Sequence, residues 1–357
     1  MLKGDILIKF NDSNIDRFLN VLKGEIPDRI PYFDFWFSKK IISAVLEKEL
    51  VAEETNENNM IYPDLISIND YIDFIYAIGQ DLTGFLLLSP DNYKLKGGEE
   101  IIKNVDIISN QEKFKKIEFP NLDNYIKEHK NRYEKMYLKA KKLNIGLTIP
   151  TGVIFQDSHQ LIGFNNFMIK VNEDMSFIED VMDFFTEIYY NLAKFICSLD
   201  IPVFFYADNI AYNNGPFLNE KLFKKIYYPR MKKVLEPALN KGLPIMFDSD
   251  GDIEWLIDDL IEFGVNAIQP IDPGGMDIYR IKEKYGNRIT IMGNVGQDFP
   301  LSTGNIDDVQ QDVKHRINIL GKSGRYVLKS SHDIGENVKI ENFIEMIKTL
   351  HKFGYYN

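Results

Sequence analysis

Two kinds of hydrophobic pattern alternate along most of the chain. Short apolar runs of the kind that form buried strands begin near residues 30, 64, 146, 203, 244, 267, 290 and 326. Longer segments between them, such as 173–199, 219–239 and 340–352, carry apolar residues at helical spacing. Strands that alternate with helices pair in parallel through right-handed crossovers. Eight such strands predict an α/β fold of the (β/α)8 TIM barrel type, with residues 1–357 as a single domain.

The first part of the chain departs from this alternation. Residues 14–23 have apolar side chains at helical spacing and predict an N-terminal helical extension. Residues 73–78 and 82–88 are expected to form two strands, and 92–119 alternates apolar and polar residues in short pieces. We therefore expect an inserted excursion near residues 72–140. An open doubly wound sheet is the alternative architecture, but no glycine-rich dinucleotide motif follows the first strand.

Polar residues follow most of the predicted strands. In a (β/α)8 barrel these positions converge on one mouth, where catalytic groups are mounted. They are Asp34, Asn69 with Asp70, Thr151, Asp208 with Asn209, Asp248 with Asp250, Asp272, Asn294, and Ser331 with His332. Asp and Asn also favour helix caps and turns, so a structural role is the better interpretation of any single one. The joint pattern predicts a functional mouth.

The most acidic of these strand ends is 244–252, where an apolar run ends in three aspartates and a glycine. Asp250 or Asp252 can cap the helix expected from Ile253, which is the plain structural alternative. Carboxylates that converge with a neutral imidazole have two chemical uses. They can bind zinc or a harder divalent ion, or they can share and shuttle protons.

Few residues of the sequence offer soft metal ligands. A single cysteine, Cys197, excludes a cysteine-rich zinc or iron–sulfur site. His332 is the one histidine placed directly at a strand exit, whereas His159 suits either a helix start or a pocket. The remaining histidines fall on charged helical segments and are expected to be solvated: His129, His315 and His351.

Composition narrows the classes of partner. A net charge of −11 disfavours a nucleic-acid surface, which needs clustered Lys and Arg. No stretch approaches the roughly 20 apolar residues of a membrane span, so we expect a soluble, cytoplasmic protein without membrane contact. Aromatic residues are frequent near the predicted mouth. Some of them must belong to the core, because alternate strand residues point into the barrel or out to its helices, and the remainder suit a flat organic ligand. These aromatic residues are Phe33, Phe35, Trp36, Phe37, Tyr206 and Tyr212.

Several segments, in the same order, resemble the uroporphyrinogen decarboxylase superfamily, which includes cobalamin (corrinoid)-dependent methyltransferases. They are 17–31, 206–217, 248–252, 276–278, 293–295 and 330–334. The resemblance covers nearly the whole chain except about 72–140. It implies a (β/α)8 barrel with its site at the carboxyl ends of the strands.

The resemblance favours the methyltransferase branch. The decarboxylases carry an arginine-rich segment after the first strand, whereas residues 33–40 contain no arginine. The methyltransferases hold zinc with a His-x-Cys pair and a later Cys. At the corresponding positions this sequence has Asp248 and Asp250, and later Ser331 with His332. The resemblance therefore implies a divalent metal, expected to be zinc, on Asp248, Asp250 and His332.

The expected activity is transfer of a methyl group from a small donor to the cobalt of a corrinoid carried by a partner protein. The donor is expected to be O-methylated, and aromatic compounds are among the candidates. Asp248 and His332 are expected to act as ligands or acid–base groups, and Asp208 and Tyr212 to position the donor. Two alternatives stay open. One is decarboxylation of a non-porphyrin acid, and the other is a non-catalytic binding barrel that has lost its metal.

Overall fold

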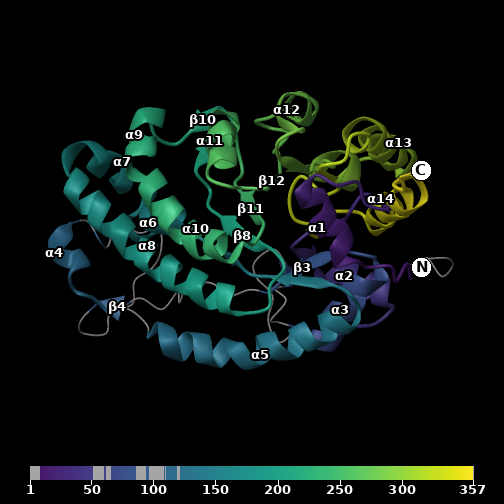
Figure 1. The fold of residues 1–357 in the computed structure, drawn as a ribbon, viewed down its shortest axis with the longest axis horizontal. Coiled ribbons are helices and arrows are strands. Elements are labelled where there is room, and N and C mark those ends of the chain that lie inside the picture. The colour runs from purple at the N-terminus through teal and green to yellow at the C-terminus, as the bar shows by residue number, and fades with distance from the viewer. Residues whose placement is uncertain are drawn as a thin grey trace.

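The computed structural model describes residues 9–50, 60–61, 66–85, 94–95, 108, 110–118 and 121–356. Its centre is a six-stranded sheet with the order β14-β13-β12-β11-β8-β7, in which all neighbours are parallel (Figure 1). The strands are β7 (Pro150–Thr151), β8 (Phe204–Ala207), β11 (Ile245–Asp248), β12 (Ala267–Gln269), β13 (Thr290–Met292) and β14 (Tyr326–Val327).

Further parallel pairings continue this sheet on both sides. β3 (Leu82–Gly84) pairs with β6 (Gly146–Thr148), which runs into β7 after one residue. Tyr32 forms a parallel bridge with Leu328, just past β14, and its carbonyl accepts a hydrogen bond from the Asp81 amide at 3.3 Å. The parallel segments thus follow one another in the neighbour order of an eight-stranded barrel. The predicted α/β class with a parallel sheet is confirmed.

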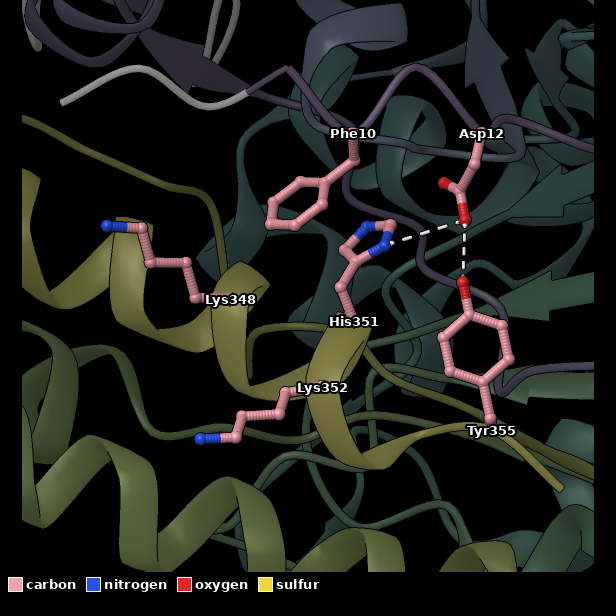
Figure 2. Close-up of a pocket in the computed structure, with 6 residues that line it drawn as sticks. All are labelled: Phe10, Asp12, Lys348, His351, Lys352 and Tyr355. Atoms are coloured by element: carbon pink, nitrogen blue, oxygen red, sulfur yellow. Dashed lines mark hydrogen bonds and ion pairs between the residues drawn. The ribbon is translucent and has the colours of Figure 1, made fainter. Parts of the chain in front are cut away.

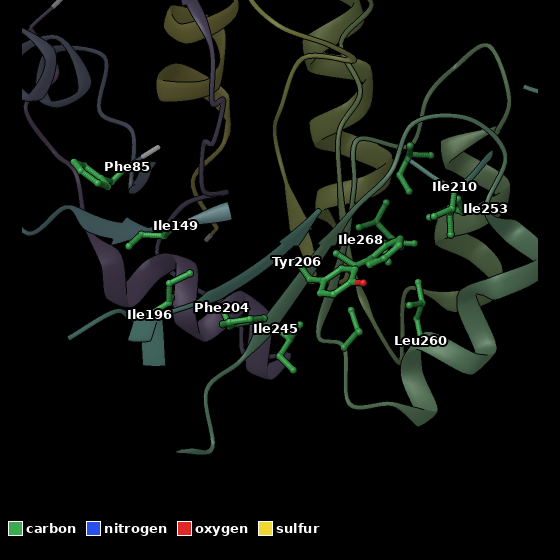
Figure 3. Close-up of a cluster of buried hydrophobic side chains, with 14 of the residues drawn as sticks. Phe85, Ile149, Ile196, Phe204, Tyr206, Ile210, Ile245, Ile253, Leu260 and Ile268 are labelled. Atoms are coloured by element: carbon green, nitrogen blue, oxygen red, sulfur yellow. The ribbon is translucent and has the colours of Figure 1, made fainter. Parts of the chain in front are cut away.

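Side chains of alternate strand positions separate into two buried clusters, as the period of two requires. Phe204, Tyr206 and Ile268 belong to the larger cluster, between the strands and the helices (Figure 3). Phe205 and Met246 belong to the smaller one, in the interior of the sheet. Complete burial of an aromatic or large aliphatic side chain contributes roughly 1.5–3 kcal/mol, so both layers stabilise the strand order.

Helices lie around the outside of the strands (Figure 1). They are α1 (Ile15–Lys23), α2 (Lys39–Leu46), α3 (Ile68–Ala77), α4 (Gln111–Phe114), α5 (Leu122–Lys142), α6 (Ile154–Ile162), α7 (Phe164–Glu173), α8 (Met175–Ser198), α9 (Glu220–Ile226), α10 (Tyr228–Lys241), α11 (Ile257–Glu262), α12 (Ile278–Tyr285), α13 (Ile306–Arg316) and α14 (Ile340–Phe353). Within the described ranges, no helix is both long enough and apolar enough to cross a membrane.

The described residues also form three antiparallel pairs of two-residue strands. They are β1 (Phe37–Ser38) with β2 (Met60–Ile61), β4 (Lys94–Leu95) with β5 (Ile117–Glu118), and β9 (Ala211–Tyr212) with β10 (Gly215–Pro216). The pair β4–β5 lies in the segment where we expected an inserted excursion.

The predicted N-terminal helix is α1, and it covers one end of the sheet interior. Its residues Phe18, Val21 and Leu22 belong to the interior cluster, and the carbonyl of Val21 accepts a hydrogen bond from Thr290 at the start of β13. α1 therefore lies at the amino ends of the strands. Buried Arg17 ties it to the start of β3 through an ion pair with Asp81 at 2.6 Å. The carboxyl ends are left for the site.

The second predicted strand, 64–68, is wrong where the structure describes it, because Ser67 caps α3 and Ile68 begins that helix; residues 64–65 lie outside the described part. Residues 73–77 are also helical. Their buried neighbours Tyr71, Phe74 and Ile75 follow helical spacing, which prevails over the apparent alternation. The strand in this part of the sheet is β3, and Asn69 and Asp70 lie in the first turn of α3 rather than at a strand exit.

Candidate active site

A cavity of about 370 Å³ lies at the carboxyl ends of the central strands. Its lining combines carboxyl, amide and ammonium groups with an aromatic wall. The residues are Phe35, Trp36, Pro150, Val153, Gln156, Phe205, Ala207, Asp208, Asn209, Asp248, Asp250, Gln269, Pro270, Lys329, His332 and Asp333. The predicted residues Asp208, Asp248, Asp250 and His332 are therefore brought to one cavity.

Asp248 ends β11, and the turn that follows places Asp250 in the same lining. Gly251 has φ +82°, and a Cβ atom there would lie 2.7 Å from the carbonyl oxygen of Ala211, so the turn requires glycine. Asp252 caps the next turn, because its side chain accepts a hydrogen bond from the Glu254 amide at 3.0 Å. The capping alternative thus holds for Asp252, whereas Asp248 and Asp250 face the cavity.

The electrostatics of Asp248 differ from those of an ordinary surface carboxyl. Burial raises the pKa of Asp248 to about 7, and the nearby charge of Asp250 acts in the same direction. The ammonium of Lys329 partly opposes this rise in pKa. A carboxyl with such a pKa holds its proton in a large share of molecules near neutral pH, which suits a general acid.

Lys329 lines the cavity but was not among the residues predicted from the sequence. Its side chain is 7 % exposed, and its Nζ lies 3.4 Å from Oδ1 of buried Asp34. Burial opposes the ammonium charge, but the carboxylates of Asp34, Asp248 and Asp333 outweigh it and raise the pKa of Lys329. The side chain is therefore a fixed positive charge. A lysine just after an apolar strand and before Ser330 was the available signal.

Asp34 pairs with that lysine from the neighbouring first strand segment. Its carboxyl accepts hydrogen bonds from the Tyr32 hydroxyl at 2.7 Å and the Ser330 hydroxyl at 2.6 Å. Burial raises the pKa of Asp34, whereas Lys329 and these hydroxyl donors lower it. The ion pair thus joins the first strand segment to the end of β14.

Asp208 has a structural task as well as a place in the lining. It accepts hydrogen bonds from the amides of Phe155 at 2.8 Å and Gln156 at 3.0 Å. These amides belong to the first turn of α6, whose own N-cap residue Val153 supplies no side-chain bond. Burial raises the pKa of Asp208 to about 8, and the two amides act in the opposite direction. Asp208 therefore fixes α6 against β8.

Two predicted site residues are more exposed than expected. Tyr212 is 50 % exposed, packs against Phe217 with ring centroids 5.4 Å apart, and does not line the cavity. The His332 side chain is 55 % exposed, and its Nδ1 lies 3.6 Å from the Asp333 carboxyl. His332 thus stands at the rim, and Asp333 rather than Asp248 is its partner.

Two other polar strand ends, Asp272 and Asn294, make structural hydrogen bonds. Asp272 accepts a hydrogen bond from the Gly274 amide at 2.8 Å and closes a turn. Asn294 donates to the Ile271 carbonyl at 2.6 Å. Thr151 is buried, but it does not line the cavity. Fewer of the predicted strand-end residues therefore line the cavity than the sequence pattern implied.

Two histidines away from this cavity have distinct surroundings. His159 lies in α6 against Phe155 and Phe164, and burial lowers its pKa to about 4. His351 was expected to be solvated, but it is only 9 % exposed. Figure 2 shows it beside Phe10, with its Nδ1 3.5 Å from Asp12, in a separate cavity of about 290 Å³. A charged helical segment predicted exposure here because its packing against the N-terminal segment was not visible in the sequence.

The residues present do not fit the expected zinc site. Among the described residues, no three His, Cys, Asp or Glu side chains gather closely enough to hold a metal ion. His332 is directed to the rim, and the buried ammonium of Lys329 repels a cation approaching Asp248. Asp248, Asp250 and His332 therefore do not form a ligand set in this arrangement.

The structure shares its fold with a solved methyltransferase. A methyltransferase from Methanosarcina mazei superposes with a TM-score of 0.66 at 16 % identity, over 96 % of this chain and 99 % of that one. A D-psicose 3-epimerase from Clostridium cellulolyticum (TM-score 0.43, 11 % identity, 79 % and 91 % of the two chains) and a xylanase from Gloeophyllum trabeum (0.42, 11 %, 77 % and 89 %) are more distant.

Comparison of the sequence with curated proteins finds no match. The model of the uroporphyrinogen decarboxylase (URO-D) family matches residues 102–353, which is more than half of the chain. The order of its landmarks in the sequence and its fold agree with that match. The chain belongs to the uroporphyrinogen decarboxylase family.

Proposed function

We propose that the protein moves a methyl group from a small methylated donor to the cobalt of a corrinoid that a partner protein carries. Residues 1–357 form a single (β/α)8 barrel domain in this proposal, with its mouth open to the partner. The observation that carries it is the half-buried carboxyl of Asp248 beside the fixed charge of Lys329, in a cavity walled by aromatic rings. Family membership and the fold of the methanogen methyltransferase support it.

The dimensions of the cavity favour a small donor. A volume of about 370 Å³ lies near the lower end of the range of small-molecule sites, so the cavity suits a small donor better than a tetrapyrrole. Phe35 meets Trp36 and Phe205 edge to face, with ring centroids 4.5 and 5.7 Å apart, and forms an apolar wall.

The charges of the cavity disfavour a polycarboxylate substrate. Lys329 is the one Lys or Arg among the described lining residues, and it is already paired with Asp34. The propionates of a porphyrinogen need several bidentate cationic partners, which arginine supplies best. A neutral donor meets no such requirement, so the cavity favours demethylation over tetrapyrrole decarboxylation.

In the proposed reaction the bond between the methyl carbon and the donor heteroatom breaks, and its electron pair stays on the heteroatom. The cobalt supplies the pair that forms the new bond to carbon. An alkoxide is a poor leaving group, so its departure requires a proton or a nearby positive charge. Protonated Asp248 delivers that proton, and the ammonium of Lys329 stabilises the charge that develops as the bond breaks.

The test is formation of methylcobalamin from reduced cobalamin and a panel of O-, N- and S-methylated small molecules, followed by the cobalt absorbance. We expect at least one neutral donor to react with the wild-type protein and Asp248→Asn to slow it by about 100-fold or more, the usual size of a general-acid contribution. Failure of every donor with both free cobalamin and a corrinoid protein would reject the proposal.

A further inference from the structure

Gln269 is a buried amide that the proposed chemistry does not use. It ends β12 in register with Asp248 on β11, so the two residues are neighbours across adjacent strands. Gln269 is 1 % exposed and lines the cavity. Neither its Oε1 nor its Nε2 has a hydrogen-bond partner in the described part of the chain. Buried polar atoms are nearly always paired, so this amide requires an explanation.

A second buried glutamine shows what the fold does with a purely structural amide. Gln80 is fully buried, and its Nε2 donates to the carbonyls of Asp34 at 2.8 Å and Leu82 at 2.7 Å. Its Oε1 accepts a hydrogen bond from the Asp34 amide at 3.2 Å. Gln80 therefore joins two strands with every part of its side chain engaged. The side-chain amide of Gln269, in contrast, bonds no other described residue, and it faces the cavity.

We propose that Gln269 determines donor specificity by binding a neutral group that both donates and accepts hydrogen bonds, a hydroxyl or a carboxamide, next to the methylated atom. The proposal rests on the proposed function, because it names the class of methyl donor. The amide presents one acceptor and two donors in a fixed plane. A ligand group that donates a hydrogen bond to Oε1 and accepts one from Nε2 satisfies both of these unpaired atoms.

The position of Gln269 next to Asp248 allows both residues to contact the same donor. Adjacent strands lie about 4.8 Å apart, so the carboxyl of Asp248 and the amide of Gln269 reach neighbouring atoms of one small ligand. The donor class is neutral because Asp250 and Asp333 repel a carboxylate in the same cavity, while an ammonium group would satisfy only the Oε1 atom of the glutamine.

The test compares two pairs of probes of matched shape, with no cobalt present. The pairs are 2-methoxyphenol with 2-methoxytoluene, and methoxyacetamide with 1-methoxy-2-methylpropane. Calorimetric titration of the wild-type protein is expected to show about 10- to 100-fold tighter binding of the hydroxyl or amide member of at least one pair. Gln269→Leu should abolish that preference and leave the affinity for the apolar member unchanged.

Gln80→Leu is the matched control for folding. It loses three hydrogen bonds and should lower the melting temperature by about 3 °C or more, whereas Gln269→Leu should leave it unchanged or raise it. Equal affinities within both pairs for the wild-type protein would overturn the proposal. So would a preference that survives Gln269→Leu, or a loss of melting temperature in Gln269→Leu equal to that in Gln80→Leu.

The outcome separates this proposal from the proposed function. A preference that depends on Gln269 without methyl transfer to cobalt from the preferred probe would support the binding role and contradict the reaction. Methyl transfer that proceeds equally well from both members of each pair would support the reaction and overturn the role of Gln269.

Discussion

Replacement of Asp248 by asparagine should make the protein more stable at alkaline pH while it removes activity. The pKa of Asp248 is raised from its ordinary value of 3.8 to about 7 by burial and by the charge of Asp250. Between these two values the folded state holds a proton that the unfolded state has released. Stability must therefore fall as pH rises through this window, and the whole penalty is present above pH 7.

The size of the penalty follows from the gap between the two pKa values. A gap of about 3 pH units corresponds to about 4 kcal/mol at 1.36 kcal/mol per unit, which is an upper bound. Water that enters the cavity solvates the carboxylate and reduces the penalty to about 2 kcal/mol. An asparagine side chain at this position would have nearly the same shape without the charge, so Asp248→Asn removes this penalty.

Urea unfolding of the wild-type protein and Asp248→Asn at pH 5 and pH 8 measures the effect. The stability advantage of the variant should grow by about 1–3 kcal/mol between the two pH values, because most of the deprotonation of folded Asp248 occurs there. Asp258→Asn, on the exposed surface, is the control and should show no such growth. An advantage of Asp248→Asn that is equal at both pH values would refute the assigned electrostatics.

Three further predictions concern single side chains. Lys329→Met should reduce kcat/KM by about 100-fold or more and lower the free energy of unfolding by about 3–5 kcal/mol, because it leaves Asp34 buried without its cation; an active, stable variant would contradict the assignment. His332→Ala should change the rate of methyl transfer by less than about 10-fold, since the side chain is exposed at the rim, and a near-complete loss in the same assay would restore the sequence-based role. Arg17→Met should cost about 3–5 kcal/mol in urea unfolding because it leaves buried Asp81 with only the more distant Arg29, at 3.8 Å, and a cost under about 1 kcal/mol would show that the ion pair is dispensable.

The parts of the fold that the sequence predicted are those with strong local patterns. Apolar runs that end in a polar residue located β8, β11, β12, β13 and β14, and their common direction brought Asp208, Asp248 and Asp250 to one cavity. The second strand was misplaced because residues 73–78 contain apolar side chains that satisfy both periods over a short window. Their helical spacing becomes decisive only when Tyr71 is included.

The missed parts of the site depend on contacts between distant segments. Lys329 resembles any strand-end lysine until its contact with Asp34, 295 positions away, is known. Gln269 is notable only because its buried side-chain amide has no hydrogen-bond partner among the described residues. A sequence pattern does not show whether a buried side chain finds a partner. His332 follows its strand as predicted, but the direction of its side chain is set by the local turn and by Asp333. Sequence position therefore located the mouth, and side-chain packing determined which groups face it.

The most direct test of the central claim is a single-turnover reaction with a donor whose methyl carbon is labelled with ¹³C and a corrinoid protein in its reduced cobalt state. The label should appear on cobalt at a rate that falls as pH rises above about 7, as protonated Asp248 is lost, and that dependence should disappear in Asp248→Asn. The account would be contradicted if no donor transferred label to cobalt while an analogue labelled at a carboxyl group released that label as CO2.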